Sequence, residues 1–237
     1  MKFKQLFSID TNAKTVKGQQ YGFMTGILYL APYKLSGYQV CAMADMAQCH
    51  VPCLNMAGRG AFSSVQKARI AKTKRFFEDR DAFMFDTYES VRALVRKAAR
   101  ENLTPLVRLN GTSDIRWEDI LFQGKTLFDW FPDVQFYDYT KIPNRKNIPA
   151  NYDLTFSYSG VVQFQPYVKK ALQNKERIAV VFRDRKTIPK TFAGLNCVDG
   201  DDSDLRHLDA KNVIVALYAK GRAKKDKSGF VVDSVGA

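Results

Sequence analysis

The segment DLTFSYSGVVQFQPYVKKALQNKERIAVVFR, residues 153–183, decides the fold. It begins with a short apolar run, continues with a helix-like stretch at 164–175 and ends with a second short apolar run. A strand, a helix and a strand in this order are typical of a βαβ unit with parallel strands. The segment therefore predicts a parallel sheet whose strands are joined by helices.

The same pattern extends to both sides of this segment. Two helices are expected between Ser63 and Asn102, because apolar residues recur there at spacings of three and four. With the two central strands, six strands are expected, the other four being GFMTGILYLAP (22–32), PLVRLN (105–110), VQFYDYT (134–140) and NVIVALYA (212–219). We predict the α/β class: a single domain over 22–237, partial (β/α) barrel-like with mostly parallel strands, after an extended N-terminal lead-in over 1–21. An open doubly wound sheet is the alternative.

Composition narrows the class of protein. Of 237 residues, 46% are hydrophobic, which excludes a disordered chain. No apolar run reaches the ~18 residues of a membrane span, and the first twenty residues lack the apolar core of a secretory signal. We therefore expect a protein of the cytoplasm with no membrane contact.

The four cysteines divide into three and one. Cys41, Cys49 and Cys53 fall within thirteen residues as C-x7-C-x3-C, whereas Cys197 stands alone. In a reducing compartment, clustered thiols favour metal binding or redox work over disulfides. Three thiolates can hold a 4Fe–4S cluster with one iron left open, while zinc would need His50 or Cys197 as a fourth ligand. We predict a metal site at Cys41, Cys49 and Cys53, with 4Fe–4S first, zinc second and ordinary buried thiols as the bland alternative.

Polar residues follow most of the expected strands. The carboxyl ends of parallel strands share one edge of a sheet, and ligands bind there in α/β folds. Strands also end in polar turns for no functional reason, so each of these residues alone is weak evidence for a ligand site. Together they predict a ligand pocket formed by Asn110, Ser113, Asp114, Tyr137, Asp138, Lys141, Ser157 and Tyr158.

Charge suggests partners without identifying one. The net charge is +13, and basic residues concentrate at 220–229, so nucleic acid or an anionic small molecule is a candidate partner, against a merely solvated basic surface. The acidic stretch at 194–209 lacks the glycine and glutamate positions of a calcium loop, which favours a turn held by pairing of its aspartates with Arg206. No G-x-S-x-G or phosphate-binding loop occurs, so common hydrolases and NTPases lose support.

Several short blocks together carry a resemblance to a known family. They include LYLAP (28–32), CLNMAGRG (53–60), ARIAKT (68–73), RLNGTSDI (108–115), FYDYTK (136–141), NYDLTFSYSG (151–160) and VDGDDSDLR (198–206). In this order they resemble the phage-encoded gene-product-eighty-eight-like family, from about residue 14 to about residue 230. The resemblance implies a viral origin, hence the host cytoplasm, and a shared fold more than an activity. Its cysteine triplet corresponds to Cys41, Cys49 and Cys53 and leaves Cys197 outside.

The layout is also similar to that of radical S-adenosylmethionine enzymes, in which a strand precedes a three-cysteine loop. That similarity implies S-adenosylmethionine on an open iron. Those enzymes use C-x3-C-x2-C and a Gly-Gly-Glu after the second strand, whereas this chain has C-x7-C-x3-C and Asn110-Gly-Thr-Ser-Asp114. Two hypotheses result: an iron–sulfur protein of the radical S-adenosylmethionine enzyme type, or a nucleic-acid-associated phage protein with a structural cluster or zinc.

Overall fold

The computed structural model describes residues 6–9 and 13–233. A sheet of nine strands runs through it in the order β1-β2-β3-β4-β5-β6-β9-β8-β7. Strands β2 to β6, β9 and β8 are parallel, and β1 and β7 are antiparallel to their neighbours at the two edges. The strands are β1 (Phe7–Ile9), β2 (Phe23–Leu28), β3 (Thr104–Arg108), β4 (Gln135–Thr140), β5 (Tyr152–Ser157), β6 (Ile178–Phe182), β7 (Thr191–Phe192), β8 (Leu195–Asp199) and β9 (Ile214–Tyr218).

The predicted fold class is confirmed. All six expected strands are present as β2 to β6 and β9, in an open, mostly parallel sheet. From β2 to β6 the spatial order follows the chain order without the reversal of a doubly wound sheet, which agrees with a partial barrel-like arrangement.

The N-terminal prediction needs correction. The lead-in over 1–21 was expected to be extended, but it contains β1 and the helix α1 (Ala13–Gln19); residues 1–5 and 10–12 lie outside the described part. The prediction is therefore wrong for α1, while β1 is extended but pairs with β2. It failed for α1 because a short helix of mostly polar residues lacks a clear apolar period.

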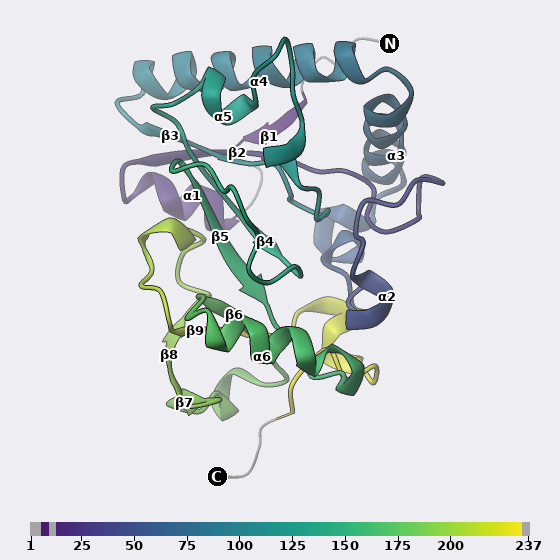
Figure 1. Cartoon of the computed structure of the whole chain (residues 1–237), viewed down its shortest axis with the longest axis vertical. Helices are drawn as coiled ribbons and strands as arrows, with labels where there is room; N and C mark the ends of the chain where they lie inside the picture. The colour runs from purple at the N-terminus through teal and green to yellow at the C-terminus, as the bar shows by residue number, and fades with distance from the viewer. Residues whose placement is uncertain (1–5, 10–12, 234–237) are drawn as a thin grey trace.

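Four helices, α3 (Ser63–Glu78), α4 (Arg80–Arg100), α5 (Leu127–Trp130) and α6 (Gln165–Gln173), cover one face of the sheet (Figure 1), whereas α1 packs near Leu205 on the other. Side chains from α4 pack there against β2 to β5, and α6 packs against β5, β6 and β9, which gives two large apolar clusters. Because strand side chains alternate in direction, the remaining residues of each strand point to the opposite face. A further short helix is α2 (Ala44–Ala47). Among the described residues, none of the helices has the length and apolarity needed to cross a membrane.

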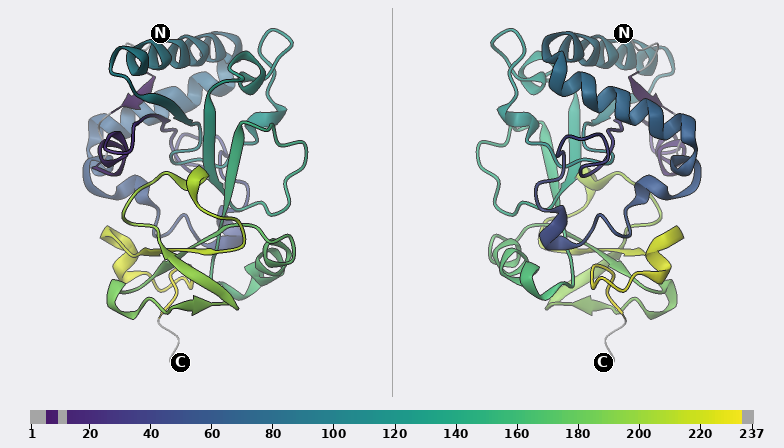
Figure 2. Two further views of the ribbon diagram at one scale, coloured as in Figure 1. Left: turned by 90° about the vertical axis from the view of Figure 1, so that its left-hand side faces the viewer. Right: turned by 90° about the vertical axis from the view of Figure 1, so that its right-hand side faces the viewer.

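The opposite face is covered by residues 200–213, which we call the plug segment (yellow-green in Figure 2, left). The Asp204 carboxylate accepts hydrogen bonds from Arg108 Nη1 at 2.6 Å and from the Tyr139 hydroxyl at 3.2 Å. Leu205 is buried with Leu106 and Tyr137. Arg206 pairs with Asp209 at 2.8 Å, so the expected pairing of Arg206 with an aspartate is confirmed. The plug segment therefore packs against this face of the sheet.

Candidate metal centre

The cysteine loop, residues 41–53, lies across the carboxyl ends of the strands. It follows β2, and two of its contacts anchor it to other strand ends. Cys41 forms an isolated bridge with Asp114, where the Asp114 N–H donates to the Val40 carbonyl at 2.8 Å. The Ser159 hydroxyl, just after β5, donates to the Ala47 carbonyl at 2.7 Å. The loop is therefore placed at the edge where ligands bind in parallel α/β folds.

The three predicted thiols lie on one loop, residues 41–53. All are free and partly buried. Burial raises the pKa of Cys41, Cys49 and Cys53, and the charges of Cys49 and Cys53 raise the pKa of Cys41 further. Cys197, on β8, also has a raised pKa, with burial as its one cause. Cys41, Cys49 and Cys53 thus share one loop, whereas Cys197 lies on β8.

Neighbouring groups offset part of the rise in the pKa of these thiols. The Tyr33 N–H donates to Cys41 Sγ at 3.4 Å, and the Asn55 N–H donates to Cys53 Sγ at 3.5 Å. The ammonium of Lys141 offsets part of the pKa rise of Cys49, and the guanidinium of Arg69 does so for Cys53. Thiolates are the ligating form, and hydrogen bonds to sulfur tune iron–sulfur sites.

The arrangement of these donors is not that of a closed metal site. Within residues 6–9 and 13–233, no group of three or more His, Cys, Asp or Glu side chains is positioned to hold an ion. His50 places Nδ1 3.0 Å from the Ala44 carbonyl, and its ring stacks on Tyr33. The donor set fits a three-thiolate site in its chemistry, and ligation would require the sulfurs to adjust.

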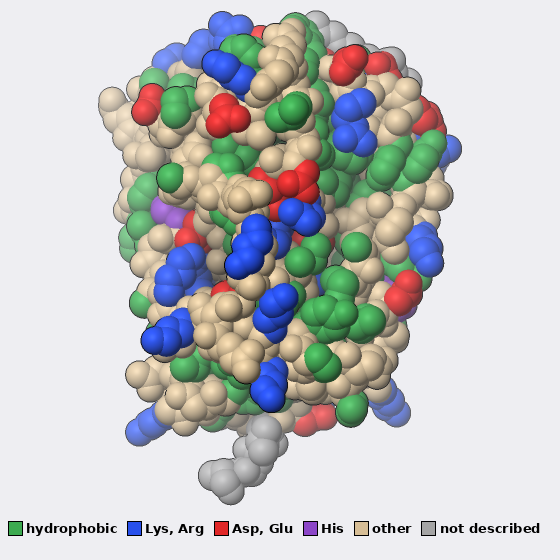
Figure 3. Space-filling view, in the orientation of Figure 1, with side chains coloured by type: hydrophobic (Ala, Val, Ile, Leu, Met, Phe, Trp, Pro, Cys, Tyr) green, Lys and Arg blue, Asp and Glu red, His purple; other side chains and the backbone are tan. Residues whose placement is uncertain are grey.

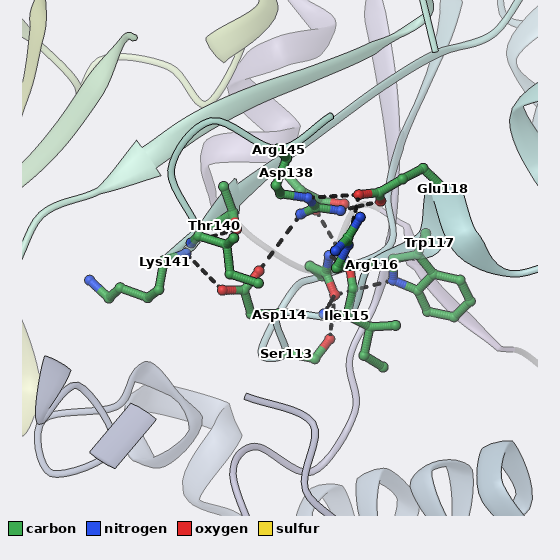
Figure 4. A network of polar contacts seen from close by, with 12 residues as sticks. Ser113, Asp114, Ile115, Arg116, Trp117, Glu118, Asp138, Thr140, Lys141 and Arg145 are labelled. Atoms are coloured by element: carbon green, nitrogen blue, oxygen red, sulfur yellow. Dashed lines mark hydrogen bonds and ion pairs between the residues drawn. The ribbon is translucent and has the colours of Figure 1, made fainter. Parts of the chain in front are cut away.

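Four of the predicted pocket residues meet beside this loop, at the ends of β3, β4 and β5. Lys141 Nζ donates to the Ser157 carbonyl at 2.7 Å, to the Ser157 hydroxyl at 2.8 Å and to the Tyr158 carbonyl at 2.8 Å. The Lys141 N–H donates to the Asp114 carboxylate at 2.7 Å (Figure 4). Burial lowers the pKa of Lys141 to about 8 and raises the pKa of Asp114. The two charged groups sit close enough to Cys49 to affect its pKa.

Three other predicted residues, Asn110, Ser113 and Asp138, form buried hydrogen bonds at the end of β3. Asn110 Oδ1 accepts from the Ser113 hydroxyl at 2.8 Å, the Ile115 N–H at 2.9 Å and Trp117 Nε1 at 3.1 Å. Asp138 accepts from the Leu109 and Asn110 N–H groups at 3.1 and 3.0 Å and from the Tyr152 hydroxyl at 3.1 Å. These polar atoms are occupied by the protein itself.

The eighth residue, Tyr137, is separated from the other seven. It packs against Leu106 and Leu205 beneath the plug segment, on the sheet face opposite to that of Asp138. The structure therefore places seven of the eight predicted residues at the ends of β3, β4 and β5, and Tyr137 apart from them.

Sequence reasoning missed Arg69, which holds the far end of the cysteine loop. Its buried guanidinium donates to Asn55 Oδ1, and it lies over the ring of Tyr29, 4.7 Å from the centroid. Gly60 is packed so closely that a Cβ there would lie 2.5 Å from the Asn55 carbonyl oxygen. As one of many cations on a basic helix, Arg69 gave no separate signal in the sequence.

Comparisons with known proteins give one match. The model of a family described as Gene product 88 matches residues 1–234. No curated protein and no solved structure matches the chain.

Proposed function

The chain belongs to the Gene product 88 family, and from this premise we propose that it is a phage-encoded iron–sulfur protein of the host cytoplasm. Cys41, Cys49 and Cys53 would hold a 4Fe–4S cluster at the carboxyl ends of the strands. The proposal is supported by three free thiols on one loop that is anchored across those ends. The fourth cysteine, Cys197, lies on a separate strand, β8.

The chain's own residues have distinct parts in this proposal. Lys141 and Arg69 would offset part of the cost of burying the thiolate forms of Cys49 and Cys53. A bound cluster would supply one-electron exchange and an open iron position. Asp114, Ser157 and Tyr158 form hydrogen bonds with Lys141 and would orient a small polar ligand.

A radical S-adenosylmethionine enzyme is the more specific form of this proposal. It draws on the parallel strand order and on a cysteine loop that follows the first parallel strand. Adding S-adenosylmethionine to the reduced protein tests it: the electron paramagnetic resonance signal should change if the ligand binds iron. An unchanged signal limits the proposal to a cluster without that ligand.

Matched cysteine variants test the cluster itself. Protein purified without oxygen should be brown, and Cys49→Ser should be colourless because one of three ligands is lost. Cys197→Ser should keep the visible absorbance of the wild type. A colourless wild-type preparation, or loss of colour in Cys197→Ser alone, would contradict the proposed ligand set.

The second candidate is a nucleic-acid-associated protein whose cluster or zinc is structural. It is favoured by the exposed cations Arg222, Lys224 and Lys225 and by the Lys and Arg side chains that run over the middle and lower part of the face in Figure 3. It predicts binding of duplex DNA or RNA that weakens steeply with salt. Affinity that is absent, or that salt does not change, removes this candidate.

A further inference from the structure

A groove lies between one side of α4 and the chain that leads from α5 into β4, at the top of Figure 1. Its volume is about 350 Å³, which falls in the range of small-ligand sites. Val134, which lines the groove, directly precedes β4, so the groove lies at the amino end of that strand. The cysteine loop lies at the carboxyl ends. The groove is therefore separate from the candidate metal centre.

Aromatic rings form one wall of this groove. Trp130, the last residue of α5, and Phe131 both line it. Tyr88 on α4 packs against both rings, with centroids 5.6 Å from that of Trp130 and 5.1 Å from that of Phe131. The Trp130 indole N–H donates to the Phe122 carbonyl at 3.0 Å, which fixes the orientation of the ring. Trp130 is only partly buried, so the wall is a fixed aromatic surface that solvent can reach.

Two guanidinium groups line the other wall. Arg92 and Arg96 are four positions apart on α4, so they project from the same side of the helix. Both are exposed; Arg92 pairs with Glu89 at 2.8 Å, and Arg96 forms no ion pair within residues 6–9 and 13–233. Arg100, also exposed, stands four positions further along the same side. A row of three arginines therefore runs from the groove along α4.

An aromatic wall beside a row of arginines matches the chemistry of a nucleotide chain. A base stacks on aromatic rings through its flat face, and a guanidinium group binds phosphate through paired hydrogen bonds. Lys125 Nζ, 5.0 Å from the centroid of the Trp130 ring, adds a further cation. The lining also includes Asp133, whose carboxylate can accept a hydrogen bond from the amino group of a base.

The groove favours a single strand over a duplex. In a duplex the bases are already stacked and paired, so a base would have to leave the stack before it could reach Trp130. In a single strand each base has a free face. We propose that this groove binds single-stranded nucleic acid, with one base against Trp130 and neighbouring phosphates along the row that begins at Arg92. This proposal goes beyond the proposed function, because it does not depend on whether the cysteine loop holds a metal.

Fluorescence anisotropy of a labelled single-stranded oligonucleotide of mixed sequence and about ten nucleotides tests the proposal on the full chain. Affinity should fall about tenfold between about 50 and 200 mM salt, as expected when two or three phosphates of a single strand are neutralised. Arg92→Gln/Arg96→Gln should lower the slope of log affinity against log salt by about 1.4, because each contact contributes about 0.7.

The matched control is Lys224→Gln/Lys225→Gln. It removes the same charge from two exposed lysines of the 3-10 turn η7 (Gly221–Lys225), which belong to the second candidate function. This variant should keep the affinity and the salt slope of the wild type. A loss of affinity in this variant, with Arg92→Gln/Arg96→Gln equal to the wild type, would overturn the assignment to the groove.

Tryptophan fluorescence tests the stacking. The chain has two tryptophans, and Trp117 is 1% exposed, so quenching by the unlabelled oligonucleotide should come from Trp130. Trp130→Phe should abolish the quenching and keep most of the affinity, because a ring remains for stacking, whereas Trp130→Leu should lower the affinity about tenfold. Quenching that persists in Trp130→Phe would contradict the placement of the base.

Three further results would overturn the proposal. The first is no measurable binding of the oligonucleotide by the wild type at low salt. The second is a duplex of the same sequence bound as tightly as the single strand. The third is adenosine monophosphate bound as tightly as the oligonucleotide, because phosphates along α4 would then contribute nothing.

Discussion

Asp138 is the residue on which the carboxyl ends of β3 and β4 are organised. It accepts three hydrogen bonds in the interior, and Arg108 Nε lies 3.8 Å from its carboxylate. Burial nevertheless raises the pKa of Asp138 to about 7. A carboxyl with a higher pKa in the folded than in the unfolded state binds more protons when folded, so its ionisation lowers stability as the pH rises.

This sign gives a pH prediction for Asp138. The stability of the wild type relative to Asp138→Asn should fall as the pH rises from about 4, the unfolded pKa, to about 7, by at most about 1.4 kcal/mol per pH unit. Above that range the difference should become constant. Urea unfolding of both proteins across this range measures it, and a difference that grows in favour of the wild type with rising pH would contradict the assignment.

Arg145 and Glu118 form a buried pair behind the site, drawn in Figure 4. Each side chain is 1% exposed, and Arg145 Nε donates to Glu118 Oε1 at 2.9 Å. Glu118→Gln leaves a buried guanidinium without its main counter-charge, which should cost about 3–5 kcal/mol of unfolding free energy.

The exposed pair Arg92–Glu89 on α4 is the matched control for that prediction. Its side chains are 48% and 37% exposed at a separation of 2.8 Å. Glu89→Gln should cost about 1 kcal/mol or less, because water screens such pairs. Denaturant unfolding compares the two variants, and equal losses would show that burial of the Glu118 pair has no special weight.

Among the elements, α3 shows that hydrophobic periodicity alone does not predict which residues of a helix are buried. The pattern places Val65, Ala68 and Ala71 or Lys72 on its inner face, whereas the structure buries Arg69, Lys72, Thr73 and Phe76. Ala68 is exposed. Lys72 is tolerated inside because its Nζ donates to the Leu6 carbonyl at 2.5 Å, although burial lowers the pKa of Lys72 to about 8. A cation whose partner lies 66 positions away cannot be assigned to the core from hydrophobic period alone.

The plug segment offers a direct test of its packing. Within the segment, Leu205 packs on the sheet and is 4% exposed, whereas Leu208, three residues further, is 60% exposed. Leu205→Ala should destabilise the protein by about 2–5 kcal/mol, because the cavity it leaves is enclosed. Leu208→Ala should change stability by about 0.5 kcal/mol or less. Thermal or urea unfolding distinguishes them, and a Leu205→Ala variant as stable as Leu208→Ala would show that the segment does not pack on the sheet.

For the whole molecule, the parallel sheet could be predicted because six of its strands contain short apolar runs, with helix-like or irregular connectors between them. The short edge strands β1 and β7 could not, since two or three residues carry no period. Strand β8 was missed as well, because its mostly exposed residues lie in the acidic stretch that was expected to form a turn. The sequence predicted that the candidate site lies at the strand ends. It did not predict that Tyr137 lies on one face of the sheet and is separated from the other candidate residues. Tyr137 and Asp138 are neighbours in sequence and point to opposite sides of the sheet. The cover over Tyr137 comes from Leu205, a contact that no local pattern encodes.

The central claim is that three thiolates of one loop hold a 4Fe–4S cluster at the strand ends. Iron and acid-labile sulfide measured on protein purified without oxygen test it most directly. The account predicts about four irons and four sulfides per chain, lost together in Cys49→Ser and unchanged in Cys197→Ser. Protein without iron and sulfide, or with zinc in their place, would contradict it.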